Sequence, residues 1–99
     1  MLGINLSLSQ EDFKLINGSI EDYMNSLSPG KKMIFDLVKK RLKQENPIFD
    51  GMYMRCMEEA LTHKMSQGES NGISRLVQFI QRKRLEFQYS NVPSLSREE

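Results

Sequence analysis

Residues 28–43 most constrain the fold, because their apolar side chains recur at the spacing of one helix face. Ser28 and Pro29 place a capping residue and a proline at the start of this segment, as is typical of a helix N-terminus. The predicted apolar stripe consists of Ile34, Leu37, Val38 and Leu42, with Phe35 at one edge. Charged residues occupy the other side. The segment therefore predicts an amphipathic helix that packs against other helices.

Two short helices are predicted before this segment. Ser9 is expected to cap the first, with acidic residues in the first turn, and Asn17-Gly18 is expected to end it. Ser19 is expected to cap the second, whose apolar positions are 20, 23, 24 and 27. Both helices follow from local start and stop patterns.

Two longer helices are predicted after the break at Asn46-Pro47. The first covers about residues 50–65, with a stripe of Tyr53, Cys56, Met57, Ala60 and Leu61. The breaker-rich residues 66–72 separate it from the last helix. That helix begins near residue 71 or 72 and carries Ile73, Leu76, Val77, Ile80 and Phe87.

These patterns predict an all-α fold, a small bundle of four to five short helices in one domain over residues 1–89. Residues 90–99 are expected to form a flexible C-terminal tail. Residues 2–8 alternate apolar and polar side chains, which indicates a short extended segment. That segment either pairs with a second copy or lies across the helices.

The composition argues against an enzyme. The chain has one histidine and one cysteine, too few ligands for a metal site, and it contains no phosphate-binding loop. Adjacent carboxylates such as Glu58 and Glu59 point in different directions on a helix, so they form no acid–base dyad. Glu59 and His63 are interpreted as a surface pair on one helix. We therefore predict no catalytic residue, no metal site and no cofactor.

The same composition bears on location. A lone cysteine, Cys56, permits no disulfide within the chain, so a reducing, intracellular compartment such as the cytoplasm is expected. Cys56 itself is interpreted as a small buried apolar group. No apolar run is long enough to cross a membrane.

Positive charge is clustered, although the formal net charge is only +1. Residues 31–43 sum to +5 and residues 75–86 to +3. Two basic helices are what a surface that contacts the phosphate backbone of a duplex needs. We expect binding of double-stranded nucleic acid with little sequence specificity, RNA slightly ahead of DNA, by a homodimer. The candidate contacts are Lys32, Lys39, Lys40, Lys43, Arg75, Arg82, Lys83 and Arg84. Solvated helix faces with the same residues are the competing interpretation.

The alternative function is a protein-interaction module, such as an adaptor or inhibitor. Its support is a helix rich in methionine, an adaptable side chain at binding surfaces. The candidate partner-binding residues are Met52, Met54, Met57 and Met65. The basic helix of residues 28–43 is a second candidate for docking, on an acidic partner.

Overall fold

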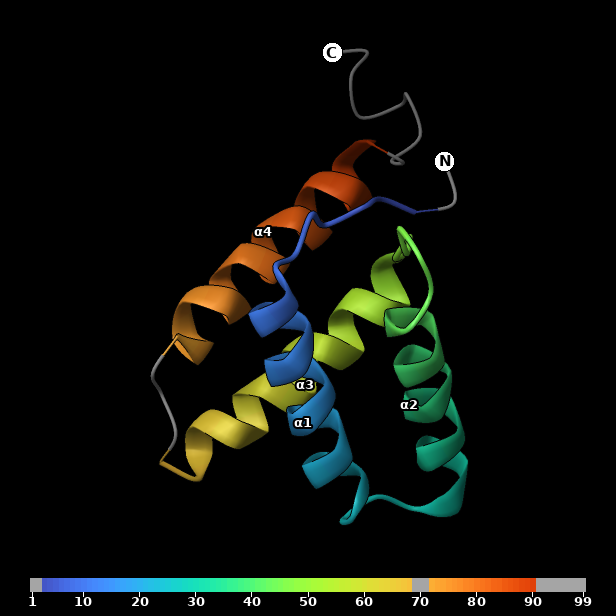
Figure 1. The fold of residues 1–99 in the computed structure, drawn as a ribbon, viewed down its shortest axis with the longest axis vertical. Helices are drawn as coiled ribbons and strands as arrows, with labels where there is room; N and C mark the ends of the chain where they lie inside the picture. Colours follow the sequence, from blue (N-terminus) through green and yellow to red (C-terminus); the bar gives the residue numbers. More distant parts are fainter. Residues whose placement is uncertain (1–2, 69–71, 91–99) are drawn as a thin grey trace.

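The computed structural model describes residues 3–68 and 72–90, and within them it contains four helices (Figure 1). The helices are α1 (Gln10–Met24), α2 (Pro29–Leu42), α3 (Gly51–Ser66) and α4 (Ile73–Ser90). They form a small all-α bundle, as predicted from the sequence.

The four helices begin close to residues that the sequence predicts as helix starts, although the Ser28 side chain makes no capping hydrogen bond at the start of α2. The Ser9 hydroxyl accepts a hydrogen bond from the Asp12 N–H, and the Asp12 carboxylate accepts one from the Ser9 N–H. Pro29 occupies the first helical position of α2. The Asp50 carboxylate accepts the Tyr53 N–H at 2.9 Å at the start of α3. Gly72, with a φ of +74°, precedes α4.

The predicted break at Asn17-Gly18 is wrong, because α1 continues through it. Ile16 and Ile20 are both fully buried on one helix face, and a break between them would take one of them out of the core. Ser19, predicted as a cap, is instead buried in the middle of α1. Its hydroxyl has no hydrogen-bond partner among the described residues. Tertiary packing therefore outweighs the local helix-ending preference here.

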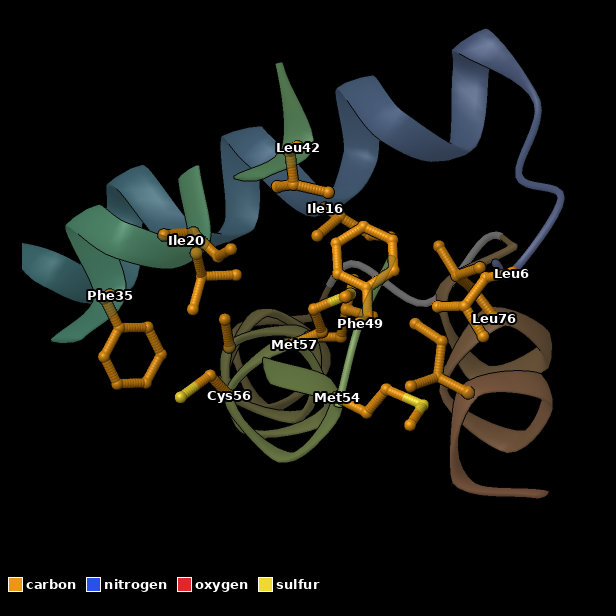
Figure 2. Close-up of a cluster of buried hydrophobic side chains, with 14 of the residues drawn as sticks. Leu6, Ile16, Ile20, Phe35, Leu42, Phe49, Met54, Cys56, Met57 and Leu76 are labelled. Carbon is orange, nitrogen blue, oxygen red and sulfur yellow. The ribbon is translucent and has the colours of Figure 1, made fainter. Parts of the chain in front are cut away.

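Helix α3 lies at the centre of the bundle (Figures 1 and 2). Figure 2 views α3 nearly end-on, with Ile16 and Ile20 of α1 above it and Met57 among the side chains beneath them. Phe35 approaches from the α2 side and Leu76 from the α4 side. Each of these five side chains is at most 5% exposed. The core is thus organised around α3.

The N-terminal segment lies extended across the helices, which is one of the two alternatives left open by the sequence. Ile4 and Phe49 exchange two backbone hydrogen bonds of 2.8 Å each, in one isolated antiparallel bridge. Leu6 and Phe49 are each 1% exposed, so the segment contributes to the core. The predicted C-terminal tail begins at Ser90, which ends α4, and residues 91–99 lie outside the described residues.

Replacing Gly18 by alanine is expected to stabilise the protein by about 1 kcal/mol. Glycine costs about that much relative to alanine inside a helix. A Cβ at Gly18 would meet no atom within 4 Å beyond the backbone of its own helix and its chain neighbours, so no steric contact opposes the gain. Urea unfolding followed by circular dichroism measures the difference.

Gly3→Ala is the control substitution. A Cβ there would approach the Phe49 carbonyl oxygen to 2.8 Å, too close for a backbone contact, so this variant is expected to lose stability. A loss of stability in Gly18→Ala would contradict the continuous α1.

Candidate functional site

Two of the predicted phosphate contacts on α2 are paired with acidic side chains. The Lys39 Nζ lies 3.1 Å from a carboxylate oxygen of Glu21 in α1, and the Lys39 side chain is mostly buried. Lys40 pairs with Asp36, one turn earlier on α2, at 3.3 Å. The Lys39 pair joins α1 to α2, so this lysine has a structural partner within the chain.

Two predicted contacts on α4 are also paired. Arg84 makes two contacts with the Glu58 carboxylate of α3, Nε to Oε2 at 2.5 Å and Nη2 to Oε1 at 3.3 Å. Both side chains are mostly buried, in the bidentate geometry that makes such pairs strong. Lys83 lies 3.7 Å from Glu86 and stands over the Phe79 ring. Arg84 therefore holds α3 and α4 together and presents little charge to a ligand.

The other four predicted contacts are exposed. Lys32 and Lys43 lie near the two ends of α2, and Arg75 and Arg82 lie on α4. Within residues 3–68 and 72–90, none of these four side chains has an ion-pair or hydrogen-bond partner. These four retain charge available to an anion.

The two basic blocks do not lie side by side. Figure 1 shows α2 and α4 on opposite sides of the bundle, with α1 and α3 between them. Helix α3 packs against α4, α1 and α2, whereas α2 and α4 do not form a helix pair of their own. A single basic track built from adjacent α2 and α4 is therefore not formed within one chain.

Most of the methionines predicted to bind a partner belong to the core. Met54 and Met57 are fully buried, and Met65 packs partly buried against the core. The expectation that Met54 and Met57 belong to an exposed docking surface is therefore wrong. The central position of α3 is the reason, since helices cover it on several sides. Met52 is the exception, with 48% of its surface exposed.

Three of the exposed large apolar side chains lie instead on α2. Phe35, Val38 and Leu42 point into the core. The prediction that Ile34 and Leu37 share this buried stripe is wrong. Three apolar side chains of α2 point away from the core: Met33 is 72% exposed, Ile34 39% and Leu37 50%. We call these three residues the outer apolar face. Helix α2 is therefore apolar on two sides.

Arg41 connects this face to the start of α3. It lies one turn after Leu37, and its guanidinium donates hydrogen bonds of 3.3 Å to the Ile48 carbonyl and the Tyr53 hydroxyl. The guanidinium also lies 4.9 Å from the centre of the Tyr53 ring. Ile48 and Met52, each 48% exposed, flank this contact in the chain. The apolar surface thus continues from α2 towards the beginning of α3, with an arginine held between them.

A polar hollow of about 440 Å³ lies where α1, α3 and α4 meet. The Tyr23 hydroxyl donates a 2.5 Å hydrogen bond to the Glu59 carboxylate. This hydrogen bond is the main cause that raises the pKa of Tyr23 to about 12, and burial of the hydroxyl is the second. The Tyr23 ring also packs against His63 with centroids 4.8 Å apart. Glu59 and His63 are therefore engaged with neighbours. No group of three candidate metal ligands occurs in the described part of the chain.

Comparison of the chain with protein-family models, curated proteins and solved structures finds no match. None of the helices in the described residues is both long enough and apolar enough to cross a bilayer.

Cys56 is expected to react slowly with a thiol reagent in the folded protein. Burial, then the charges of Glu59 and Asp50, raise the pKa of the Cys56 thiol from 9.0 to about 11. Two pKa units correspond to about a hundred-fold less thiolate near pH 8, and thiolate is the reactive form. The rate of labelling by dithiobis-nitrobenzoate, in buffer and in urea, measures the effect.

The labelling rate is expected to rise as the pH approaches 11, since the thiolate becomes populated only there. Equal rates for the folded and the urea-unfolded chain at pH 8 would contradict the buried position of Cys56.

Proposed function

We propose that this chain is a non-enzymatic protein-interaction module that docks on a partner through α2. The outer apolar face of Met33, Ile34 and Leu37 is the observation that carries the proposal. This assignment keeps the adaptor or inhibitor function considered from the sequence and moves its surface from the methionines of α3 to α2.

The physical support is the pattern of burial on α2. A helix at the surface of a small bundle ordinarily buries one apolar stripe and presents polar residues to water. Here α2 buries Phe35 and Val38 and also exposes Met33 and Leu37. Contiguous exposed apolar surface is a recurrent feature of protein-binding sites. A partner that covers this side would remove the apolar surface from water.

We propose nucleic-acid binding as a second candidate function, supported by the four exposed basic side chains without partners. Lys32 and Lys43 would contact phosphates from α2, and Arg75 and Arg82 from α4. Duplex RNA remains slightly ahead of DNA in this proposal, because such contacts read backbone shape and not base edges. The candidate has less support than docking, since four of the eight predicted contacts are paired within the chain and the two helices lie apart.

Two further features belong to these proposals. A homodimer would bring the separated basic surfaces of two copies together and would strengthen the second candidate. A reducing, intracellular location such as the cytoplasm would suit a chain whose single cysteine, Cys56, is a buried free thiol.

Photocrosslinking tests the docking proposal. The photoreactive residue benzoylphenylalanine replaces Leu37 in one variant of the full chain and Leu85 in another. Each variant is expressed and irradiated in cells of the organism that naturally produces this protein. Leu85 is a matched position, because it is a leucine on α4 with 40% exposure. We expect the Leu37 position to give discrete adducts with an identifiable protein, and the Leu85 position to lack them.

Adding Met33→Gln to the Leu37 variant is expected to weaken those adducts, while the helix content stays unchanged by circular dichroism. The docking proposal would be overturned by adducts that are the same at both positions, or by no protein adduct at Leu37.

Charge reversal tests the nucleic-acid candidate. Lys43→Glu is expected to weaken binding of a labelled RNA duplex at low salt and to reduce the slope of log affinity against log salt by about one. Fluorescence anisotropy at several salt concentrations measures both quantities. Lys14→Glu is the matched control, since Lys14 is exposed on α1 outside both basic blocks. Equal slopes for the two variants would eliminate α2 as a phosphate-binding helix.

A further inference from the structure

A second hollow, of about 240 Å³, lies between the N-terminal segment, the first turn of α1 and the beginning of α4. It is on the α4 side of the bundle, whereas the outer apolar face belongs to α2 on the opposite side (Figure 1). The hollow is smaller than the ~300–1,000 Å³ of pockets for drug-sized ligands, so it suits a small molecule. Its lining combines three apolar and three polar residues: Leu8, Leu76, Phe79, Ser7, Asp12 and Arg75.

The apolar part of the lining is anchored in the fold. Leu76 is 5% exposed, and Leu8 and Phe79 pack partly buried against the core. The chain bends at Ser7, directly before Leu8, with a φ of +55° in the left-handed region that serine seldom adopts. The Ser7 N–H donates a 2.7 Å hydrogen bond to the Asn5 side chain, which stabilises this bend. The apolar lining is therefore formed before any ligand binds.

Two opposite charges line the same hollow without neutralising each other. The Arg75 side chain has no ion-pair or hydrogen-bond partner in the described part of the chain. The Asp12 carboxylate accepts the Ser9 N–H at 3.2 Å, and among the same residues it has no cationic partner. Arg75 and Asp12 therefore form no ion pair with each other. The hollow presents one positive and one negative group, and each is available to a ligand.

This combination separates the classes of small ligand. A simple carboxylate would pair with Arg75 but would also face the Asp12 carboxylate, and like charges brought together are unfavourable. An amine would have the opposite mismatch. A phosphate group would meet the same acidic side chain and would leave the apolar lining uncovered. A molecule that carries a carboxylate, an ammonium group and an apolar body satisfies all three parts of the lining.

We propose that this hollow binds an apolar α-amino acid as the free zwitterion. The Arg75 guanidinium binds the carboxylate of the ligand, because its planar set of donors matches two carboxylate oxygens. The Asp12 carboxylate binds the ammonium group. The side chain of the ligand packs against Leu8, Leu76 and Phe79, which removes apolar surface from water. This ligand site is separate from the docking surface on α2, so the two proposals are independent.

Four ligands test the chemistry by two-dimensional amide NMR of the isotopically labelled full chain. L-Phenylalanine carries all three features, 3-phenylpropionate lacks the ammonium group, 2-phenylethylamine lacks the carboxylate, and glycine lacks the apolar side chain. We expect L-phenylalanine to shift the amide signals of Ser7, Leu8 and Leu76, with saturation in the millimolar range. Each of the other three ligands is expected to bind at least about tenfold more weakly, since each lacks one charged or apolar contact.

Two variants test the roles of the charged side chains. Arg75→Gln and Asp12→Asn are each expected to lose at least about tenfold in affinity for L-phenylalanine. Arg75→Gln is expected to leave the weak binding of 2-phenylethylamine unchanged, which a general disturbance of the hollow would not. Asparagine keeps an oxygen that can accept the Ser9 N–H, so the start of α1 is retained.

Arg82→Gln is the matched control and is expected to bind L-phenylalanine as the unmodified chain does. Arg82 is likewise exposed on α4 and unpaired among the described residues, but it does not line the hollow. Circular dichroism verifies that each variant keeps its helix content.

Several outcomes would overturn this inference. Equal affinities for L-phenylalanine, 3-phenylpropionate and 2-phenylethylamine would reject a zwitterion as the ligand. Equal affinities of Arg75→Gln and Arg82→Gln, or shifts confined to residues away from the hollow, would place the ligand elsewhere. No shift with L-phenylalanine or L-leucine at about 10 mM would remove the site. Each of these results would leave the docking function of α2 in place, because crosslinking at Leu37 tests that function separately.

Discussion

Burial of α3 is the constraint on which the rest of this structure depends. Met57, Ala60 and Leu61 are fully buried there, because α1, α2 and α4 all pack around this one helix. The mostly buried ion pair between Arg84 and Glu58 fixes α4 against α3 in addition to the apolar contacts. A small chain can surround only one helix in this way. The other three helices therefore each retain a large solvent-facing side.

The consequence is clearest on α2, which is apolar towards the core and towards water. Phe35 and Val38 are buried in the core, while Met33 and Leu37 are exposed to water. Arg41 continues this outer side to the start of α3 through its contacts with Ile48 and Tyr53. The proposed docking function follows from this second apolar side.

Charge clusters in a sequence overstate the charge that a folded surface presents. Lys39 and Arg84 both belong to basic blocks, yet each is paired with an acidic residue distant in the sequence, Glu21 and Glu58 respectively. Such pairs are set by how helices pack, and no local pattern contains that information. The exposed lysines near the ends of α2 were predictable as candidates, whereas their separation from the exposed arginines of α4 was not. The outer apolar face was hidden for a similar reason, since Ile34 and Leu37 match a buried stripe as well as Val38 does.

The sequence by itself determined that this chain is helical, where most helices begin and that α3 is apolar on one side. Those properties depend on capping, proline geometry and apolar spacing within a few residues, as at Ser9, Pro29 and Asp50. Only the tertiary structure decided that α1 continues through Gly18, which side of α2 faces the core and which charges are neutralised. Each of these outcomes depends on contacts between distant segments, where burial of side chains such as Ile16 and Ile20 outweighs a local preference of about 1 kcal/mol.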